Sequence, residues 1–331
     1  MAISEIRKHD GPCVSLRERA GETGAKREVL ESGVWRICGR HERQALSLWR
    51  AAEVTVYRGI LLGCGCWNRG WHAAHSPVLR EITVPVFGLP RDLDGFTILH
   101  LSDLHFGRTY PEHARAVFRL VDGITADLCV VTGDFRHGHY GPDDHVVPMF
   151  RELLNQLRIR YGCWAVLGNH DTLSLGERLE SGAGVRVLYN EAEPVTVGAG
   201  VRFWVAGVDD PHWFRLDDPD RALHGVPEGE FRMMLAHSPE AAAAAARRGV
   251  ALYLCGHTHG GQICLPGSVP IMKNARCPRF LLKGLWRLGA MTGYTTTGLG
   301  FTDLPQRFWC PPEAVMLRLR PDTADMRAGN T

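Results

Sequence analysis

The segment Leu254-Cys-Gly-His-Thr-His-Gly-Gly-Gln262 places two histidines one residue apart, among three glycines. The apolar run Val250 to Cys255 leads into them and predicts a short buried strand. His257 and His259 are therefore expected on the loop at the carboxyl end of that strand, where ligand sites gather in open α/β sheets. Neutral imidazole is the commonest metal ligand, and glycine permits the tight turns that let both rings face one point. The segment predicts a metal site if the rest of the chain supplies further ligands.

Four other apolar runs also end in polar side chains. The residues that follow the predicted strands at 96–102, 128–132, 163–167 and 231–236 are Asp103, His105, Asp134, Asn169, His170, Asp171 and His237. Taken singly, each has an ordinary explanation, since Asp caps helices and Asn favours turns. One rigid sheet can nevertheless aim all of its strand ends at one place. The complete ordered set therefore predicts a polar site with metal-ligand chemistry.

Strands and helices alternate through the middle of the chain, and a β-rich half follows. Further strands are expected at 81–87, 185–188, 194–197, 201–208, 250–255, 290–297 and 314–319, and helices at 111–123, 143–160 and 239–248. This order predicts an α/β core with two packed sheets.

The N-terminal part of the chain is basic, with 13 Lys/Arg and 9 Asp/Glu in residues 1–90, although the whole chain has a net charge of +2. Residues 1–27 lack periodicity, which predicts a flexible arm, whereas residues 28–62 predict one or two helices. Their arginines and tryptophans suit helices packed on the main domain, or alternatively a membrane-surface element. We expect an N-terminal extension at 1–90, a catalytic domain at 91–320 and a flexible tail at 321–331.

Ten cysteines are scattered without a CxxC pair, which indicates a reducing compartment. The N-terminus is polar and has no apolar core of a secretory signal. The apolar patch at residues 59–67 is too short to cross a bilayer. These features favour a cytoplasmic location, with peripheral contact at the inner face of the membrane as a further possibility.

The ordered motifs Asp-x-His, Gly-Asp, Gly-Asn-His-Asp, His and Gly-His-x-His resemble those of the calcineurin-like metallophosphoesterase superfamily, over about residues 91–320. Residues 256–262 and the closing block, with Leu304-Pro, Arg307-Phe and Pro311-Pro-Glu313, are similar to one bacterial branch. That branch includes secreted or membrane-associated phosphoesterases and enzymes that hydrolyse UDP-diacylglucosamine. The resemblance implies an α/β fold, a four-layer α-β-β-α sandwich of two mixed sheets, with a mainly helical N-terminal extension.

The resemblance also implies two divalent metal ions (Mn, Fe or Zn) bound by seven side chains. The first ion would be held by Asp103, His105, Asp134 and His259, and the second by Asp134, Asn169, His237 and His257. Asp134 would bridge the two ions, which fits the need for a carboxylate between adjacent cations that clamp a phosphoryl group. The mixed oxygen and nitrogen donors suit these metals better than Mg²⁺ or Ca²⁺.

The implied reaction is attack on phosphorus by a hydroxide that bridges the two metals. His170 would protonate the leaving oxygen. Asp171 would orient His170 or a metal ligand from outside the metal shell. His170 and Asp171 are therefore the expected catalytic residues of a dinuclear phosphoester hydrolase.

The substrate is less constrained than the reaction. In residues 271–288 basic side chains alternate with apolar ones, which indicates either an irregular connection with a small buried cluster or a lip for lipid-linked phosphate and anionic membrane. We favour a lipid-linked, UDP-diacylglucosamine-like phosphoester as substrate. The alternative is a soluble phosphodiesterase that acts on cyclic nucleotides or small phosphoesters.

Two further functions are disfavoured. Residues 91–331 carry 25 Lys/Arg and 27 Asp/Glu with no long basic stripe, so a nuclease and a nucleic-acid partner are not expected. A metal-binding scaffold without catalysis would have lost a motif residue, and here every position is filled. The sequence carries no signal for the oligomeric state.

Overall fold

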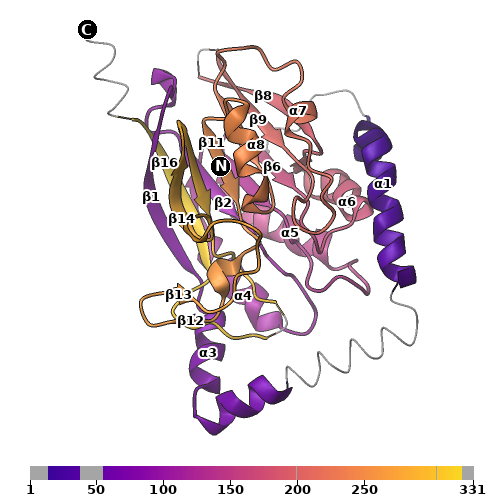
Figure 1. Cartoon of the computed structure of the whole chain (residues 1–331), viewed down its shortest axis with the longest axis vertical. Helices are drawn as coiled ribbons and strands as arrows, with labels where there is room; N and C mark the ends of the chain where they lie inside the picture. Colours follow the sequence, from indigo (N-terminus) through magenta and orange to yellow (C-terminus); the bar gives the residue numbers. More distant parts are fainter. Residues whose placement is uncertain (1–13, 38–54, 199, 303, 323–331) are drawn as a thin grey trace.

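Two six-stranded sheets face each other and carry helices on their outer sides (Figure 1). The computed structural model of the protein describes residues 14–37, 55–198, 200–302 and 304–322. The first sheet has the order β1 (Val78–Val86), β16 (Glu313–Pro321), β2 (Thr97–Leu101), β4 (Leu128–Thr132), β6 (Cys163–Val166) and β7 (Arg186–Val187). The second has the order β14 (Gly284–Leu288), β15 (Met291–Thr295), β11 (Leu252–Cys255), β10 (Arg232–Leu235), β9 (Val201–Gly207) and β8 (Glu191–Val197).

Both sheets are mixed, with parallel strands at their centres. In the first sheet β2, β4, β6 and β7 run parallel, while β16 is antiparallel to β2. In the second sheet β9, β10, β11 and β15 run parallel, and β8 and β14 are antiparallel edges. Central parallel strands such as β4 and β11 are buried along their whole length, as expected when both faces are covered.

Three apolar clusters define the layers. One cluster, made mostly of strand residues, fills the space between the two sheets. A second lies on the outer face of the first sheet, under α1 (Leu16–Ile37), α4 (Pro111–Val121), α5 (Val146–Gln156) and α6 (Leu173–Ala183). The third lies on the outer face of the second sheet, under α7 (Pro219–Ala222) and α8 (Ala242–Arg247). The expected four-layer α-β-β-α sandwich is confirmed.

The expected flexible arm over residues 1–27 is wrong for residues 16–27, which belong to α1. Within residues 16–33, whose side chains the structure describes, this helix buries Leu16, Ala20 and Arg27, so that part of its inner face lacks a run of large apolar residues. The helices expected at 28–62 correspond to the end of α1 and to a helix at residues 55–63. Residues 1–13, 38–54 and most of the expected tail, 323–331, lie outside the described residues.

Two other elements differ from expectation. α6 was not expected, yet it has ordinary ends: Thr172 caps its first turn by accepting from the Leu175 N–H at 3.1 Å, and Gly184 ends it in the left-handed region at φ 72°. α5 is shorter than the expected helix at 143–160, because β5 (Arg158–Ile159) pairs with β3 (Thr125–Ala126).

β1 forms the edge of the first sheet and pairs in parallel with β16 along its whole length. The division that we expect at residue 90 therefore leaves one strand of this sheet in the N-terminal extension. α3 (Trp67–Ala74) precedes that strand and packs Gly70 against Phe308. None of the helices in the described part of the chain is both long and apolar enough to cross a membrane.

Candidate metal centre

The carboxyl ends of five parallel strands meet at one edge of the sandwich. β2, β4 and β6 of the first sheet lead to Asp103, Asp134 and Asn169, and β10 and β11 of the second lead to His237 and His257. Parallel strands present their carboxyl ends on the same side, so their following loops gather there. The structure thus brings together the side chains that the sequence predicts as ligands.

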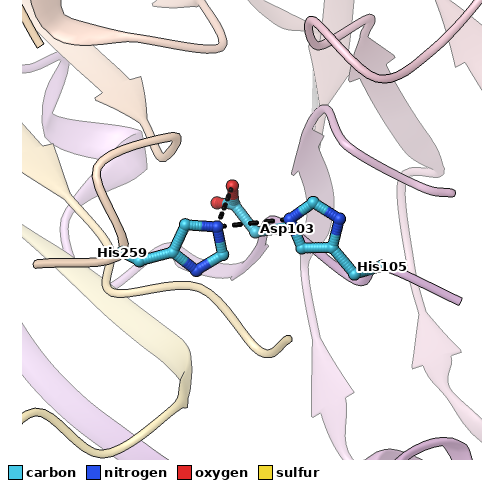
Figure 2. A group of neighbouring side chains, drawn as sticks. All are labelled: Asp103, His105 and His259. Atoms are coloured by element: carbon cyan, nitrogen blue, oxygen red, sulfur yellow. Dashed lines mark hydrogen bonds and ion pairs between the residues drawn. The ribbon is translucent and has the colours of Figure 1, made fainter. Parts of the chain in front are cut away.

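The first group of donors consists of Asp103, His105 and His259. One ligand atom from each lies within 4.8 Å of the others. His105 Nε2 is 3.2 Å from His259 Nε2, and His259 Nε2 is 3.4 Å from Asp103 Oδ1. Figure 2 shows the two rings approaching each other with the carboxylate beside them. All three side chains are buried.

The second group consists of Asp134, His237 and His257, again with ligand atoms within 4.8 Å of one another. His257 Nδ1 is 3.2 Å from His237 Nε2. Asn169 joins this group, because its Oδ1 lies 3.0 Å from His237 Nε2. An amide oxygen, a carboxylate and two imidazoles therefore converge on one buried point.

Asp134 lies between the two groups. Its Oδ2 is 3.6 Å from His105 Nε2 in the first group and 3.3 Å from His237 Nε2 in the second. The same oxygen is 3.8 Å from His170 Nε2. One carboxylate is thus shared by both groups and adjoins His170.

Backbone carbonyls orient two of the imidazoles. His237 Nδ1 lies 2.7 Å from the Thr132 carbonyl, and His105 Nδ1 lies 3.1 Å from the Arg136 carbonyl. A ring nitrogen that donates to a carbonyl keeps its proton, so Nε2 is the atom of each ring that can offer a lone pair to a metal. Both Nε2 atoms point into the centre, and each could bind a metal when it carries no proton.

The backbone at the centre is strained and closely packed. The residues with positive φ include Asp103 (52°), His105 (45°), Asp134 (55°), His257 (67°) and His259 (48°). Such conformations in non-glycine residues cost free energy and cluster at functional sites. Gly168 and Gly256 make the close approach possible: a Cβ on Gly168 would lie 2.2 Å from Asp134 Oδ1, and one on Gly256 would lie 2.0 Å from Ser102 Oγ.

The donors fit a pair of divalent cations. Asp103 Oδ1 is buried and has no hydrogen-bond partner among the described residues. Leaving a carboxylate oxygen unpaired in a protein interior is costly, and a cation held by the first group would satisfy it. The mixture of carboxylate, amide oxygen and imidazole is one that first-row transition metals and zinc accept.

Comparison with known proteins agrees with this geometry. Residues 96–261, half of the chain, match the calcineurin-like phosphoesterase family. The chain belongs to this family. It is accordingly a phosphoester hydrolase, and the metal ions that its Asp and His clusters suggest are those of a metallophosphoesterase.

Relatives of this metallophosphoesterase occur in bacteria and animals. The uncharacterized metallophosphoesterase YkuE of Bacillus subtilis is 31% identical over 255 residues, which cover 74% of this chain and 86% of YkuE. The phosphodiesterase YaeI of Escherichia coli is 30% identical over 240 residues, 68% of this chain and 82% of YaeI. A transmembrane protein with metallophosphoesterase domain from Danio rerio is 30% identical over 309 residues, and they span 87% of this chain and 65% of that protein.

The carboxylates of the metallophosphoesterase centre have divergent pKa values. Burial raises the pKa of Asp103 to about 6, with the negative charge of Asp134 adding to the rise and His237 opposing it. Burial alone would also raise the pKa of Asp134, but His237, His170 and His105 hold it well below its usual range. Asp134 is therefore ionised at neutral pH.

Most histidines of the centre are neutral. Burial lowers the pKa of His105 and His259 well below the usual range, and that of His257 to about 4. His237 is the exception: burial opposes its charge, yet Asp134 raises its pKa to about 10. A proton and a metal ion compete for its Nε2, so metal binding at this nitrogen would release the proton.

Asp171 is buried and binds backbone rather than the His170 ring. Its carboxylate accepts from the N–H groups of Asp134 at 2.8 Å, Phe135 at 2.9 Å and Gly168 at 2.9 Å. It thereby ties the loop after β4 to the loop after β6. Asp171 therefore contacts the backbone of Asp134 from outside the two donor groups.

Sequence reasoning did not assign a role to Arg307, which is fully buried beside the centre. Its Nη1 donates to the His259 carbonyl at 3.0 Å, and its Nη2 lies 3.1 Å from His259 Nδ1. Arg307 therefore fixes the loop that carries His259. The sequence feature that could have indicated this role is the position of Arg307 in the closing block, which resembles the bacterial branch.

A stack of rings also escaped notice in the sequence. His139 stacks on His170 with centroids 3.8 Å apart, and Trp213 stacks on His139 at 5.2 Å. His212 lies 4.1 Å from the His257 ring and holds Glu240 through Nδ1 at 2.7 Å. Aromatic and imidazole rings from the loop after β4 and the loop after β9 therefore form one wall of the centre.

Proposed function

We propose that the protein is a dinuclear metal-dependent phosphodiesterase. The observation that carries this proposal is the position of the Asp134 carboxylate between two donor groups, within 3.6 Å of His105 and 3.3 Å of His237. Two cations about 3.5–4 Å apart form a clamp on both oxygens of an in-line displacement. The ligands would be Asp103, His105, Asp134 and His259 for one ion, and Asp134, Asn169, His237 and His257 for the other.

The residues around this centre have separate tasks. When bound, the two ions supply charge stabilisation at the phosphoryl oxygens and activate water. His170 lies against Asp134 with its side chain 12% exposed, so it is reachable by the leaving oxygen of a bound ester. We assign to it the delivery of a proton or hydrogen bond to that oxygen. Asp171 and Arg307 hold the loops that carry these groups.

The experiment that tests this function is hydrolysis of bis(p-nitrophenyl) phosphate by the protein reconstituted with Mn²⁺, Fe²⁺ or Zn²⁺. The expected result is metal-dependent turnover and two bound ions per chain, measured by elemental analysis. Asp134→Ala should lose both ions and at least about 100-fold in turnover, because even outer partners of metal ligands are worth 10–100-fold. The exposed His224→Ala is the matched control. An Asp134→Ala protein with normal turnover would refute the assignment.

For the substrate we propose a lipid-linked phosphodiester, because an apolar surface adjoins the metal loop. We call this surface the apolar rim; it consists of Leu265, Val269, Ile271, Met272 and Trp309, all exposed. β12 (Cys264–Leu265) and β13 (Val269–Pro270) form its hairpin (Figure 1). Gly261, two residues after His259, packs closely on Pro270 of this hairpin, since a Cβ on Gly261 would lie 2.7 Å from Pro270. The rim therefore begins beside the loop that carries His259.

Segment 271–288 contains both a small buried cluster and exposed apolar side chains. Leu281, Leu282 and Trp286 are buried in the cluster on the second sheet, whereas Met272 is 66% exposed and Phe280 is 53% exposed. Arg69 places its guanidinium 5.1 Å over the Trp309 ring, which adds a cation to the rim. Exposed apolar groups with cations beside them suit anionic lipid, so we also propose peripheral contact with the inner face of a membrane.

Co-sedimentation with vesicles of phosphatidylglycerol, compared with phosphatidylcholine alone, tests the membrane contact. Binding to the anionic vesicles should be lost in Ile271→Asp/Met272→Asp, while turnover of bis(p-nitrophenyl) phosphate is kept. Val29→Asp, an exposed apolar position on α1, is the control. Absence of binding by the wild-type protein would leave the alternative, a phosphodiesterase for cyclic nucleotides or small esters. Relative rates on a UDP-linked lipid and a cyclic nucleotide then decide between the substrates.

A further inference from the structure

Arg27 is a fully buried arginine of the N-terminal helix that reaches a loop of the metal centre. α1 lies beside α6 at the periphery of the molecule, far along the chain from the motifs (Figure 1). A glycine of α6 allows a close fit: Leu16 of α1 meets Gly176, where a Cβ would lie 2.6 Å from Leu16 Cδ2. This packing places Arg27 over the start of α6, next to the loop that carries Asn169 and His170.

The guanidinium of Arg27 binds the backbone of that loop. Its Nη2 donates to the Gly168 carbonyl at 2.9 Å and to the Asp171 carbonyl at 2.7 Å. These two carbonyls bracket Asn169 and His170. Arg27 therefore fixes both ends of the four-residue motif from outside the centre.

The same guanidinium binds a second loop. Its Nη1 pairs with the buried carboxylate of Asp209, and its Cζ lies 4.0 Å over the ring of Phe214. Asp209 also accepts from the Tyr189 hydroxyl at 2.7 Å. The loop from Asp209 to Phe214 carries Trp213, which reaches His170 through the His139 ring. Arg27 thus joins two loops that meet at His170.

Two carboxylates, those of Asp209 and Glu31, compensate the charge of Arg27. Burial opposes its charge, but Asp209 and Glu31 hold the pKa of Arg27 above its usual value. Glu31, one turn further along α1, accepts from Arg27 Nε at 2.9 Å and from the N–H of Leu173 at 3.0 Å. A buried ion pair of this kind is weak support for stability, but loss of one partner leaves the other charge unpaired.

We propose that Arg27 is a positioning residue of the active site, which holds His170 in the orientation that serves the leaving oxygen. The N-terminal helix is then part of the catalytic apparatus. This inference rests on the role proposed for His170. A lysine in its place would supply a point charge, and only the planar guanidinium reaches two carbonyls and a carboxylate together.

The test compares two diesters that differ in leaving group, bis(p-nitrophenyl) phosphate and diphenyl phosphate. Phenolate is the poorer leaving group and needs a proton more. Arg27→Ala should therefore lose about 10–100-fold on diphenyl phosphate and clearly less on the nitrophenyl ester, as His170→Ala should. In the double variant the two losses should not add. Arg27→Lys should be intermediate, and the exposed neighbour Lys26→Ala should match the wild type.

Amide hydrogen exchange gives a reading that does not depend on activity. Arg27→Ala should exchange faster than Lys26→Ala at residues 168–173 and 209–214, with two metal ions still bound. If Arg27→Ala fails to fold, Arg27→Lys carries the same comparison. An equal loss on both diesters, or unchanged exchange in the two loops, would overturn the proposal. If the wild-type protein hydrolyses neither diester, the proposed function fails, and the exchange data still decide whether Arg27 holds the loops.

Discussion

His257 and His259 share one loop but face different donors. His257 Nδ1 is 3.2 Å from His237, whereas His259 Nε2 is 3.2 Å from His105. The residue between them, Thr258, binds the Leu282 carbonyl at 2.6 Å and faces away from the centre. A His-x-His pair can therefore serve two ions when its backbone is held in the left-handed region at both histidines.

Single substitutions should separate the two positions. His257→Ala is expected to weaken the ion that Asn169 and His237 bind, and His259→Ala the ion that Asp103 and His105 bind. Titration of the metal-free proteins with Mn²⁺ should show one tight and one weak ion in each variant. Turnover should fall by more than about 100-fold in both, since both ions are needed to clamp the ester. A pattern in which either variant loses both ions equally would contradict the division.

At the level of helices and strands, the motif loops could be predicted because each follows a short buried strand. The four residues of β11 are buried throughout, and so are those of β10 after its first residue, Arg232, which is typical of strands covered on both faces. The order of the strands within each sheet could not be predicted, because neighbours such as β16 and β2 are far apart along the chain.

The first half of the N-terminal helix, residues 16–27, was missed for a physical reason. Its inner face presents Leu16, Ala20, Gly24 and Arg27, which do not form an apolar stripe. The burial of Arg27 is possible only because Asp209 and two carbonyls meet it, and those partners are more than 140 residues away in sequence. The periodicity of apolar residues is a local property of the sequence, so it does not indicate a helix whose burial depends on polar partners far along the chain.

The contact between α1 and α6 can be tested through stability. Leu16→Ala removes a fully buried side chain that packs on Gly176. The free energy of unfolding should fall by about 2–5 kcal/mol, the usual cost of such a cavity. Urea unfolding monitored by circular dichroism measures it. Val29→Ala, which is 67% exposed on the same helix, should change it by less than about 0.5 kcal/mol. Equal effects of the two variants would show that α1 is not packed as described.

For the whole molecule, two histidines outside the metal centre link stability to pH. Burial lowers the pKa of His100 to about 3 and that of His113 to about 4. In the unfolded chain both titrate near about 6.5. Below that pH the unfolded chain binds protons that the folded protein excludes, so the free energy of unfolding falls as the pH drops from about 6.5 towards 4.

Each of these histidines should contribute up to about 1.4 kcal/mol per pH unit to that fall. Urea unfolding of the metal-free protein between about pH 7 and pH 5 measures the slope, with chelator present so that metal release does not contribute. His113→Gln keeps a donor for the Leu104 carbonyl, which His113 Nε2 meets at 2.8 Å, and should flatten the slope. His224→Gln, at an exposed position, should not. An unchanged slope in His113→Gln would show that this ring is protonated in the folded state.

The pairing of β16 has a consequence for how the protein is made. β16 lies between β1 and β2, and its residues leave the ribosome more than 200 residues after those of β2. Until then β1 and β2 both present unpaired edges, which invite association with other chains. Glu313, the first residue of β16, also accepts from the Thr297 N–H and the Tyr294 hydroxyl close to Asp103. The nascent chain therefore completes the surroundings of its first motif only when β16 has been synthesised, and ribosome-stalled chains that end before residue 313 should be the form that chaperones retain.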